Sequence, residues 1–311
     1  MLHDAPELFP IVEGCKSCFM CRFICTSART LNTEKDTPRG RSLLLSMIRR
    51  GTLSYNADVA DAIFSCCLCA HCRASCASHF DFPAVAVAAR TDMVQAGLLP
   101  KVLAPVRQSL AAHDNPYGVS ALDPALASAI ADLPRTADTL LLLGPDARFR
   151  RPSAALAAIA VFKKLGLSCT CLEREPSSVY LLHELGAEEE SGRKREELAK
   201  AIKASGAARV ICLDPRAYHR MGQEAGPARK MHFIELAAEY AGRLKPASGK
   251  SFSYHEPDYL VRWSDLREAA DTLLRALGDY KPPYWRGVEA KSLGGILSAL
   301  YRPDFADMLA V

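Results

Sequence analysis

The sequence predicts a mixed fold, in which a helical, cysteine-rich N-terminal domain is followed by an α/β domain with a parallel sheet. Two observations support this prediction. Nine of the twelve cysteines lie between Cys15 and Cys76, and helix-forming segments separate them. Beyond residue 118, short apolar runs alternate with amphipathic segments, which is typical of parallel β-α-β units. We therefore predict one domain over residues 1–118 and a second over residues 119–311.

The composition of the chain indicates a globular protein without a nucleic-acid partner. Of its 311 residues, 49% are apolar and 24% are charged, which is enough apolar material for two ordinary domains. The net charge is +4 and is shared evenly. Residues 1–118 hold 12 of the 39 basic and 10 of the 35 acidic side chains, which leaves 27 and 25 for the rest. Neither domain as a whole is basic enough to predict nucleic-acid binding.

The first residues predict no secretory signal, because they contain neither a basic segment nor an apolar one. The longest apolar runs also fall short of the roughly 20 residues that span a bilayer. We therefore expect the protein in the cytoplasm. Thiols stay reduced in that compartment, and clustered cysteines there bind metal more often than they form disulfides.

Start and stop signals predict three helices in the first domain. Thr37 is a good N-cap, and Pro38 suits the first turn of a helix that includes residues 42–50. Two further helices are expected over residues 56–64 and 83–96. Residues 113–118 are rich in turn formers and predict the boundary between the domains.

In the second domain, strands and helices are expected in alternation, as in a buried parallel sheet covered by helices. The predicted strands cover residues 139–143, 167–172, 209–213 and 252–255. The predicted helices cover residues 153–165, 179–185, 193–204, 233–241 and 264–277.

Two cysteine runs with identical spacing dominate the first domain. Each has the pattern Cys-x2-Cys-x2-Cys-x3-Cys; the members are Cys15, Cys18, Cys21 and Cys25 in the first run, and Cys66, Cys69, Cys72 and Cys76 in the second. This pattern, repeated twice, is typical of two [4Fe–4S] clusters. The two-residue gaps let one tight loop present three thiolates to one cluster. The fourth cysteine starts the following helix and points toward the cluster of the other loop. The predicted ligand sets therefore cross over: Cys15, Cys18, Cys21 and Cys76 for cluster 1, and Cys66, Cys69, Cys72 and Cys25 for cluster 2.

The alternative interpretation of the two runs is structural zinc, which also takes four thiolates and uses Cys-x2-Cys spacing. Zinc sites do not require two runs of four regularly spaced cysteines, so the double run favours iron–sulfur clusters. Cys67 breaks the spacing and is expected to be a buried packing residue.

About forty residues separate the two runs, and here the chain resembles a known family. The two runs, the Pro38-Arg39-Gly40-Arg41 segment and the helix that follows it resemble the α-helical two-cluster ferredoxin module over residues 10–100. That module occurs in iron–sulfur subunits of glycolate oxidase, lactate-utilisation and anaerobic glycerol-3-phosphate dehydrogenase systems, and of heterodisulfide reductases. Family members usually carry proline after the fourth cysteine, whereas this chain has Thr26 and Ala77.

Arg39 and Arg41 are candidate cluster-proximal residues. A fixed positive charge beside a negatively charged cluster would stabilise its reduced state and raise its potential. The alternative is that both are ordinary arginines at a solvated helix start.

The second domain resembles the family's cysteine-rich domain, which is marked by Cys-Cys-Gly and Cys-Pro-x-Cys segments, but lacks its thiols. Asp214-Pro215-Arg216-Ala217 and His255-Glu256-Pro257-Asp258 stand where that family has cysteine-containing motifs, and the Cys-Cys-Gly places fall near residues 175–178 and 291–295. Without thiolates, these positions cannot assemble the family's third cluster. Asp214, His255, Glu256 and Asp258 could instead form a polar or hard-metal site, or the domain could serve only for docking. Cys169, Cys171 and Cys212 are expected to be packing residues.

The leading hypothesis is therefore an electron-transfer subunit with two [4Fe–4S] clusters and no catalytic residues of its own. The resemblance implies, as partner, a flavoprotein dehydrogenase or heterodisulfide-reductase-type subunits in a hetero-oligomeric complex, with quinone or another iron–sulfur protein as a further acceptor. A partner could also hold the protein at the cytoplasmic face of the inner membrane. The alternatives are a catalytic thiol–disulfide reductase and a zinc-stabilised assembly or scaffold protein.

Overall fold

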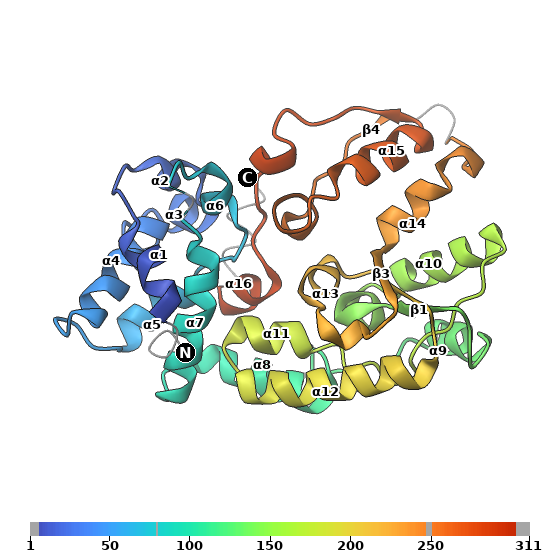
Figure 1. Cartoon of the computed structure of the whole chain (residues 1–311), viewed down its shortest axis with the longest axis horizontal. Coiled ribbons are helices and arrows are strands. Elements are labelled where there is room, and N and C mark those ends of the chain that lie inside the picture. The colour runs from blue at the N-terminus through green and yellow to red at the C-terminus, as the bar shows by residue number, and fades with distance from the viewer. Residues whose placement is uncertain (1–5, 79, 247–250, 303–311) are drawn as a thin grey trace.

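The computed structural model describes residues 6–78, 80–246 and 251–302. It has the predicted mixed fold, with a largely helical N-terminal half followed by a region that contains small parallel sheets. In Figure 1 the N-terminal helices, in blue and teal, lie at one side of the molecule, and the strands with their covering helices lie at the other. The chain then returns, and α16 (Ile296–Tyr301) lies beside the N-terminal helices.

The helices of the N-terminal half form where their sequence signals predict them. Thr37 caps α4 by accepting a hydrogen bond from the Gly40 backbone N–H, and Asn56 caps α5 in the same manner. The α-helices of this half are α1 (Phe9–Glu13), α2 (Met20–Ile24), α3 (Thr26–Leu31), α4 (Pro38–Arg49), α5 (Ala57–Phe64), α6 (His71–Ser75), α7 (Phe82–Gln95) and α8 (Ala104–His113). The three predicted helices are confirmed as α4, α5 and α7.

A three-stranded parallel sheet organises the second half of the chain. Its strands are β1 (Thr139–Leu142), β2 (Arg209–Cys212) and β3 (Arg229–His232), with β2 in the centre. Thr139 pairs with Arg209, and Arg209 in turn pairs with Arg229. All three strands therefore end at one edge, where the chain turns into Gly144 after β1 and Asp214 after β2.

Helices cover both faces of this sheet, because successive apolar side chains of a strand point to opposite sides. Leu141, Ile211 and Met231 face one apolar core, while Leu140, Val210 and Cys212 face the other. The first core is completed by α9 (Pro124–Ala131), α10 (Pro152–Leu165) and α14 (Phe233–Glu239). The second is completed by α11 (Val179–Leu185), α12 (Glu188–Ser205) and α13 (Pro215–Arg220).

Two of the four predicted strands differ from the structure. Residues 167–172 form only a single bridge, between Leu140 and Thr170, so the prediction of a strand there is wrong. The residues on either side of this bridge do not continue the hydrogen-bonded ladder. The strand predicted over residues 252–255 is reduced to β4 (Ser251–Phe252), which pairs with β5 (Asp279–Tyr280) in a separate sheet.

Other differences concern polar sequences. The strand β3 was not predicted, because its sequence Arg-Lys-Met-His carries no alternating apolar pattern. The helix α12 begins at Glu188, five residues before the predicted start, since three glutamates in its first turn favour a helix N-terminus. The last predicted helix begins only at Arg267 as α15 (Arg267–Leu277), after a π-helical turn over Tyr259–Trp263.

The α11 helix joins the two halves of the chain, because its side chains enter both apolar cores. Leu181, Leu182 and Leu185 pack into the core of the N-terminal helices, whereas Val179 and Tyr180 face the sheet. Gly186 ends α11 with a φ of 86°, and a Cβ there would lie 2.5 Å from the Arg90 carbonyl carbon of α7. In the described part of the chain, no helix combines the length and the apolar character needed to cross a bilayer.

Candidate metal centres

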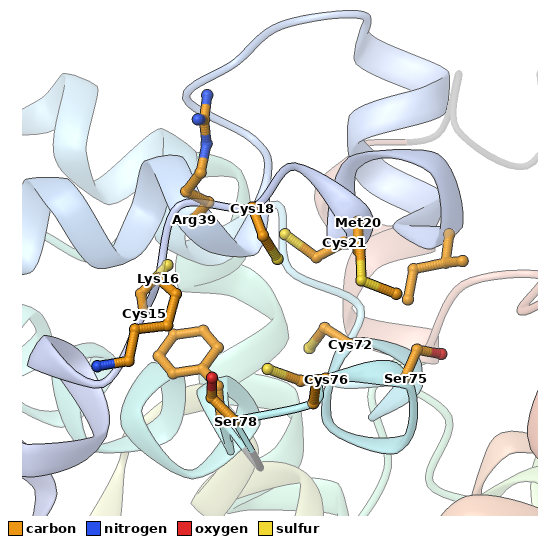
Figure 2. Close-up of a pocket in the computed structure, with 13 residues that line it drawn as sticks. Cys15, Lys16, Cys18, Met20, Cys21, Arg39, Cys72, Ser75, Cys76 and Ser78 are labelled. Carbon is orange, nitrogen blue, oxygen red and sulfur yellow. The ribbon is translucent and has the colours of Figure 1, made fainter.

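The first cysteine run surrounds a cavity. It is lined by Cys15, Cys18 and Cys21 from the loop of the first run, and by Cys72 and Cys76 from the loop of the second run. Figure 2 shows these five sulfur atoms arranged around one central space. The cavity, which we call cavity 1, thus brings together all four residues predicted to bind cluster 1.

The second run surrounds a neighbouring cavity, which we call cavity 2. The second loop contributes Cys66, Cys67, Cys69 and Cys72, and the first run contributes Cys25. Cavity 2 therefore holds the four residues predicted for cluster 2, including the one that crosses over. Since Cys72 lines both cavities, the two sites are adjacent.

The two cysteine loops repeat the same unusual backbone conformation. The residues on either side of the second cysteine are left-handed in both loops: Ser17 (φ 53°) and Phe19 (φ 65°) match Leu68 (φ 54°) and Ala70 (φ 58°). Such conformations cost a residue other than glycine about 1–2 kcal/mol. A five-residue helix then begins at the same point of each loop, α2 in the first and α6 in the second. The shared backbone is what turns three thiols of each run toward one cavity.

The fourth cysteines of the two runs differ in their position relative to the neighbouring helices. Cys25 directly precedes α3, as predicted for a cysteine that begins the following helix. Cys76 follows α6, and α7 begins only at Phe82, so the same prediction is wrong for Cys76. Even so, each fourth cysteine lines the cavity of the opposite run.

The chemistry of the cavity walls fits iron–sulfur clusters. Burial raises the pKa of Cys21 to about 11 and that of Cys69 to about 12, and it also raises the pKa of Cys72. Without a nearby cation these thiols stay protonated, whereas bound iron would replace the protons and take the thiolates as ligands. Within residues 6–78, 80–246 and 251–302, no three His, Cys, Asp or Glu side chains are close enough together to hold a single metal ion.

Arg41 lies beside the thiols of cavity 2. It is fully buried, its Nη1 lies 4.0 Å from the Cys25 sulfur, and its Nη2 donates to Ser27 at 2.9 Å and to Ser65 at 2.8 Å. Its Nη2 also lies 3.5 Å from the buried carboxylate of Asp36. Burial lowers the pKa of Arg41, but the neighbouring Cys66 and Cys25 outweigh this effect and the net shift is upward. The side chain is therefore a fixed positive charge at the wall of cavity 2.

Arg39 contributes its backbone to cavity 1 and directs its charge elsewhere. Its backbone N–H bonds to the Cys21 sulfur and opposes the rise of that thiol's pKa. The guanidinium pairs with Glu34 and stacks on the Phe19 ring, 3.7 Å from the centroid. Figure 2 shows it pointing away from the sulfur atoms. Of the two arginines, only Arg41 places its guanidinium beside the thiols.

The residue between these two arginines, Gly40, has no room for a side chain. A Cβ at this position would lie 2.1 Å from the backbone oxygen of Glu34, a distance no side chain can adopt. The loop after α3 thus packs directly on the first turn of α4. Arg39 and Arg41, two positions apart in this first turn, point to nearly opposite sides of the helix.

We predict that Arg41→Gln lowers the reduction potential of cluster 2 by on the order of 50–100 mV, because it removes a buried positive charge. Arg41→Lys keeps the charge and should restore most of the shift. Arg39→Gln should change the potential of neither cluster substantially. Potentiometric titration followed by EPR measures all three variants. Equal shifts in Arg39→Gln and Arg41→Gln would show that Arg41 has no special electrostatic role.

Two buried arginines outside the cysteine runs hold the second loop, and sequence reasoning missed both. Arg90 donates to the carbonyl oxygens of Cys66 at 2.6 Å and Glu184 at 2.8 Å. Arg262 donates through Nε to the carbonyl oxygen of Cys69 at 2.6 Å. Each arginine therefore joins the wall of cavity 2 to the second half of the chain. Their sequence surroundings carry no motif, so only the fold reveals them.

The C-terminal segment covers the second loop. Trp263 donates its indole N–H to the Leu68 carbonyl at 3.0 Å, and Ser298 donates to the Cys66 carbonyl at 3.4 Å. A Cβ on Gly295 would lie 3.0 Å from the Cys67 carbonyl oxygen, so the backbones approach closely there. The segment near 291–295, which lacks the resembled family's cysteines, thus packs against cavity 2.

A polar cavity lies at the carboxyl edge of the parallel sheet. Of the four residues proposed for a polar or hard-metal site, Asp214, His255 and Asp258 line it, whereas Glu256 is buried and accepts from the Gly287 backbone. Arg216 pairs with Glu184 at 3.1 Å within the same wall. The structure therefore gathers three of the four residues around a charged cavity, and Cys67 lines both this cavity and cavity 2.

The cysteines outside the two runs are packed in the second half of the chain. Cys169 and Cys212 are buried, and Cys171 is partly buried. Burial raises the pKa of Cys169 to about 11 and raises those of Cys171 and Cys212 as well. They behave as small apolar side chains, and Cys67 is equally buried.

Comparison with known proteins gives no relative for this chain. No family model, no curated protein and no solved structure matches it.

Proposed function

We propose that the protein is an electron-transfer subunit that holds two [4Fe–4S] clusters. The observation that supports this most is the grouping of the thiols: each of two adjacent cavities is lined by three cysteines of one run and the last cysteine of the other. Bound clusters would supply one-electron redox chemistry. The residues of this chain would hold them and shield the second loop from water.

The chain's own groups would set how easily each site takes an electron. Around cavity 2, Arg41 adds a positive charge, and Arg90 and Arg262 fix the loop carbonyls. Both arginines pair with a carboxylate, Arg39 with Glu34 and Arg41 with Asp36, but only Arg41 also places its guanidinium beside a sulfur, 4.0 Å from Cys25. A buried positive charge favours the reduced, more negative state of a cluster, so cluster 2 should have the higher potential.

The partners and the location of the protein follow from the resemblance and are part of the proposal. We infer a hetero-oligomeric complex with a flavoprotein dehydrogenase or heterodisulfide-reductase-type subunits, in the cytoplasm or at the cytoplasmic face of the inner membrane. Quinone or another iron–sulfur protein would be the further acceptor. The bond-breaking chemistry would then belong to a partner.

Anaerobic metal and sulfide analysis tests the proposal. We expect about eight irons and as many acid-labile sulfides per chain, with little zinc. Cys72→Ser should lose iron and sulfide together. A colourless protein that contains zinc in place of iron would refute the proposal and support the zinc-stabilised scaffold.

One observation favours a second candidate, the reduction of a small disulfide in the polar cavity. Cys67 lines both that cavity and cavity 2, so a substrate there would lie beside cluster 2. Burial raises the pKa of the Cys67 thiol well above its usual value, which opposes a nucleophilic role. Disulfide reduction by the cluster-loaded protein that is lost in both Cys67→Ala and Arg216→Ala would establish this candidate.

A further inference from the structure

We propose that the surface around cavity 1 docks a redox protein that carries an acidic rim, so that cluster 1 exchanges electrons with the partner. This surface consists of Phe19, Met20, Phe23, Leu43 and Met47, and we call it the cluster-1 face. The inference rests on the proposed two-cluster function. It adds which cluster meets a protein partner, through which side chains, and what charge that partner carries.

The two cavities differ in how far they are covered. Of the cysteines in the cavity 2 wall, Cys69 is partly exposed and the other four are buried, and Arg262 and Trp263 donate to backbone carbonyl groups of the second loop. In cavity 1, Cys18 is exposed, and Cys15, Cys21 and Cys76 are partly exposed. Because electron transfer weakens steeply with distance, a partner protein reaches cluster 1 more directly than cluster 2.

Apolar side chains are exposed on α2, which carries Cys21, and on the neighbouring α4. Phe23 is 73% exposed, Leu43 62%, Met20 53%, Phe19 50% and Met47 36%. Phe19, Met20 and Phe23 lie on α2 and at its N-cap, and Leu43 and Met47 lie on α4, which packs against α2. The Arg39 guanidinium stacks on Phe19 one helical turn before Leu43. Met20 also lines cavity 1 itself. Exposed apolar groups gathered at one place mark an interaction site, and Phe, Met and Arg are typical of interface centres.

Positive charge surrounds the same surface. Residues 13–50 contain eight basic and three acidic side chains, a net charge of +5, while the whole chain carries only +4. Lys16 lines cavity 1, and Arg22 is exposed on α2. Acidic side chains of this segment form ion pairs: Glu34 pairs with Arg22 and Arg39, and Glu13 pairs with Arg49.

This charge pattern selects the partner. A basic rim around an apolar centre complements a partner face with acidic residues around an apolar centre, and it steers such a partner toward cavity 1. Electron-transfer complexes use small interfaces, so five apolar side chains with a charged rim are sufficient. Each encounter would transfer one electron between the partner's redox group and cluster 1.

Stopped-flow kinetics with a small acidic flavoprotein tests the proposal. Fully reduced flavodoxin is mixed anaerobically with the oxidised, cluster-loaded protein, and the bleaching of the cluster absorbance gives a second-order rate constant. We expect this constant to fall about tenfold or more in Phe23→Glu and in Leu43→Glu, and to decrease as salt is raised. Val102→Glu is the matched control, because Val102 is 49% exposed and lies outside the cluster-1 face.

Reduction by dithionite, which needs no protein docking, distinguishes a failure of this inference from a failure of the proposed function. If all variants hold wild-type iron and dithionite reduces them at equal rates, the clusters are intact and the flavodoxin rates report docking alone. The proposal is overturned if Phe23→Glu reacts within twofold of wild type, if Val102→Glu slows equally, or if salt has no effect. It is also overturned if flavodoxin fails to reduce a wild-type protein that dithionite reduces. Protein that binds no iron would instead refute the two-cluster function.

Discussion

Cys15→Ala and Cys76→Ala are expected to remove the same cluster, although these two cysteines belong to different runs. Both side chains line cavity 1, together with Cys18 and Cys21. By the same reasoning, Cys25→Ala should remove the cluster that Cys69→Ala removes, because both line cavity 2. Each single variant should fall from about eight to about four irons per chain.

The identity of the remaining cluster decides between crossed and uncrossed ligand sets. With crossed sets, Cys15→Ala and Cys76→Ala give one residual EPR spectrum, and Cys25→Ala and Cys69→Ala give the other. Uncrossed sets would pair Cys15 with Cys25 and Cys69 with Cys76. The four spectra of the reduced proteins therefore form two matched pairs in either case, and which variants match is the result. Wild-type iron in any of the four would contradict the assignment of that residue.

Arg90→Met is expected to destabilise the protein by about 3–5 kcal/mol, because it leaves several buried carbonyl groups without a donor. The guanidinium donates to Cys66 at 2.6 Å, to Glu184 at 2.8 Å, and to Ile63 and Phe64 at 3.3 Å. Methionine fills much of the space but supplies no N–H. The loss should loosen cavity 2 and the contact of α7 with α11 together.

Denaturant unfolding of the cluster-loaded protein under anaerobic conditions measures this loss. Arg135→Met serves as the control, because Arg135 is exposed. It should stay within about 0.5 kcal/mol of wild type. Should Arg90→Met also unfold at the wild-type midpoint with its full iron content, the carbonyl contacts would carry no net stability.

Local sequence signals predicted much of the fold. The N-caps Thr37 and Asn56 act as predicted, and the apolar runs at residues 139–143 and 209–213 form β1 and β2. Elements whose formation depends on neighbours were not predicted. The polar strand β3 forms because its backbone pairs with β2. Residues 167–172 form only a single bridge, to Leu140, and no hydrogen-bonded ladder.

The sequence predicted those features of the candidate site that depend on the spacing of the cysteines. All eight spaced cysteines line the two cavities, and each cavity contains cysteines of both runs, with Cys72 in both. The sequence could not distinguish Arg39 from Arg41, because only the packing of α4 shows which of its sides faces the thiols of cavity 2. Likewise Arg90 and Arg262 reach the second loop from distant segments, and no local pattern marks such contacts.

EPR of the fully reduced protein tests the central claim most directly. Two adjacent [4Fe–4S] clusters predict about two unpaired spins per chain, with a signal broadened by their mutual interaction. In Cys76→Ala the spin count should fall to about one, and the broadening should disappear. An EPR-silent protein that contains zinc, or a single unbroadened signal in the fully loaded wild type, would contradict the two-cluster account.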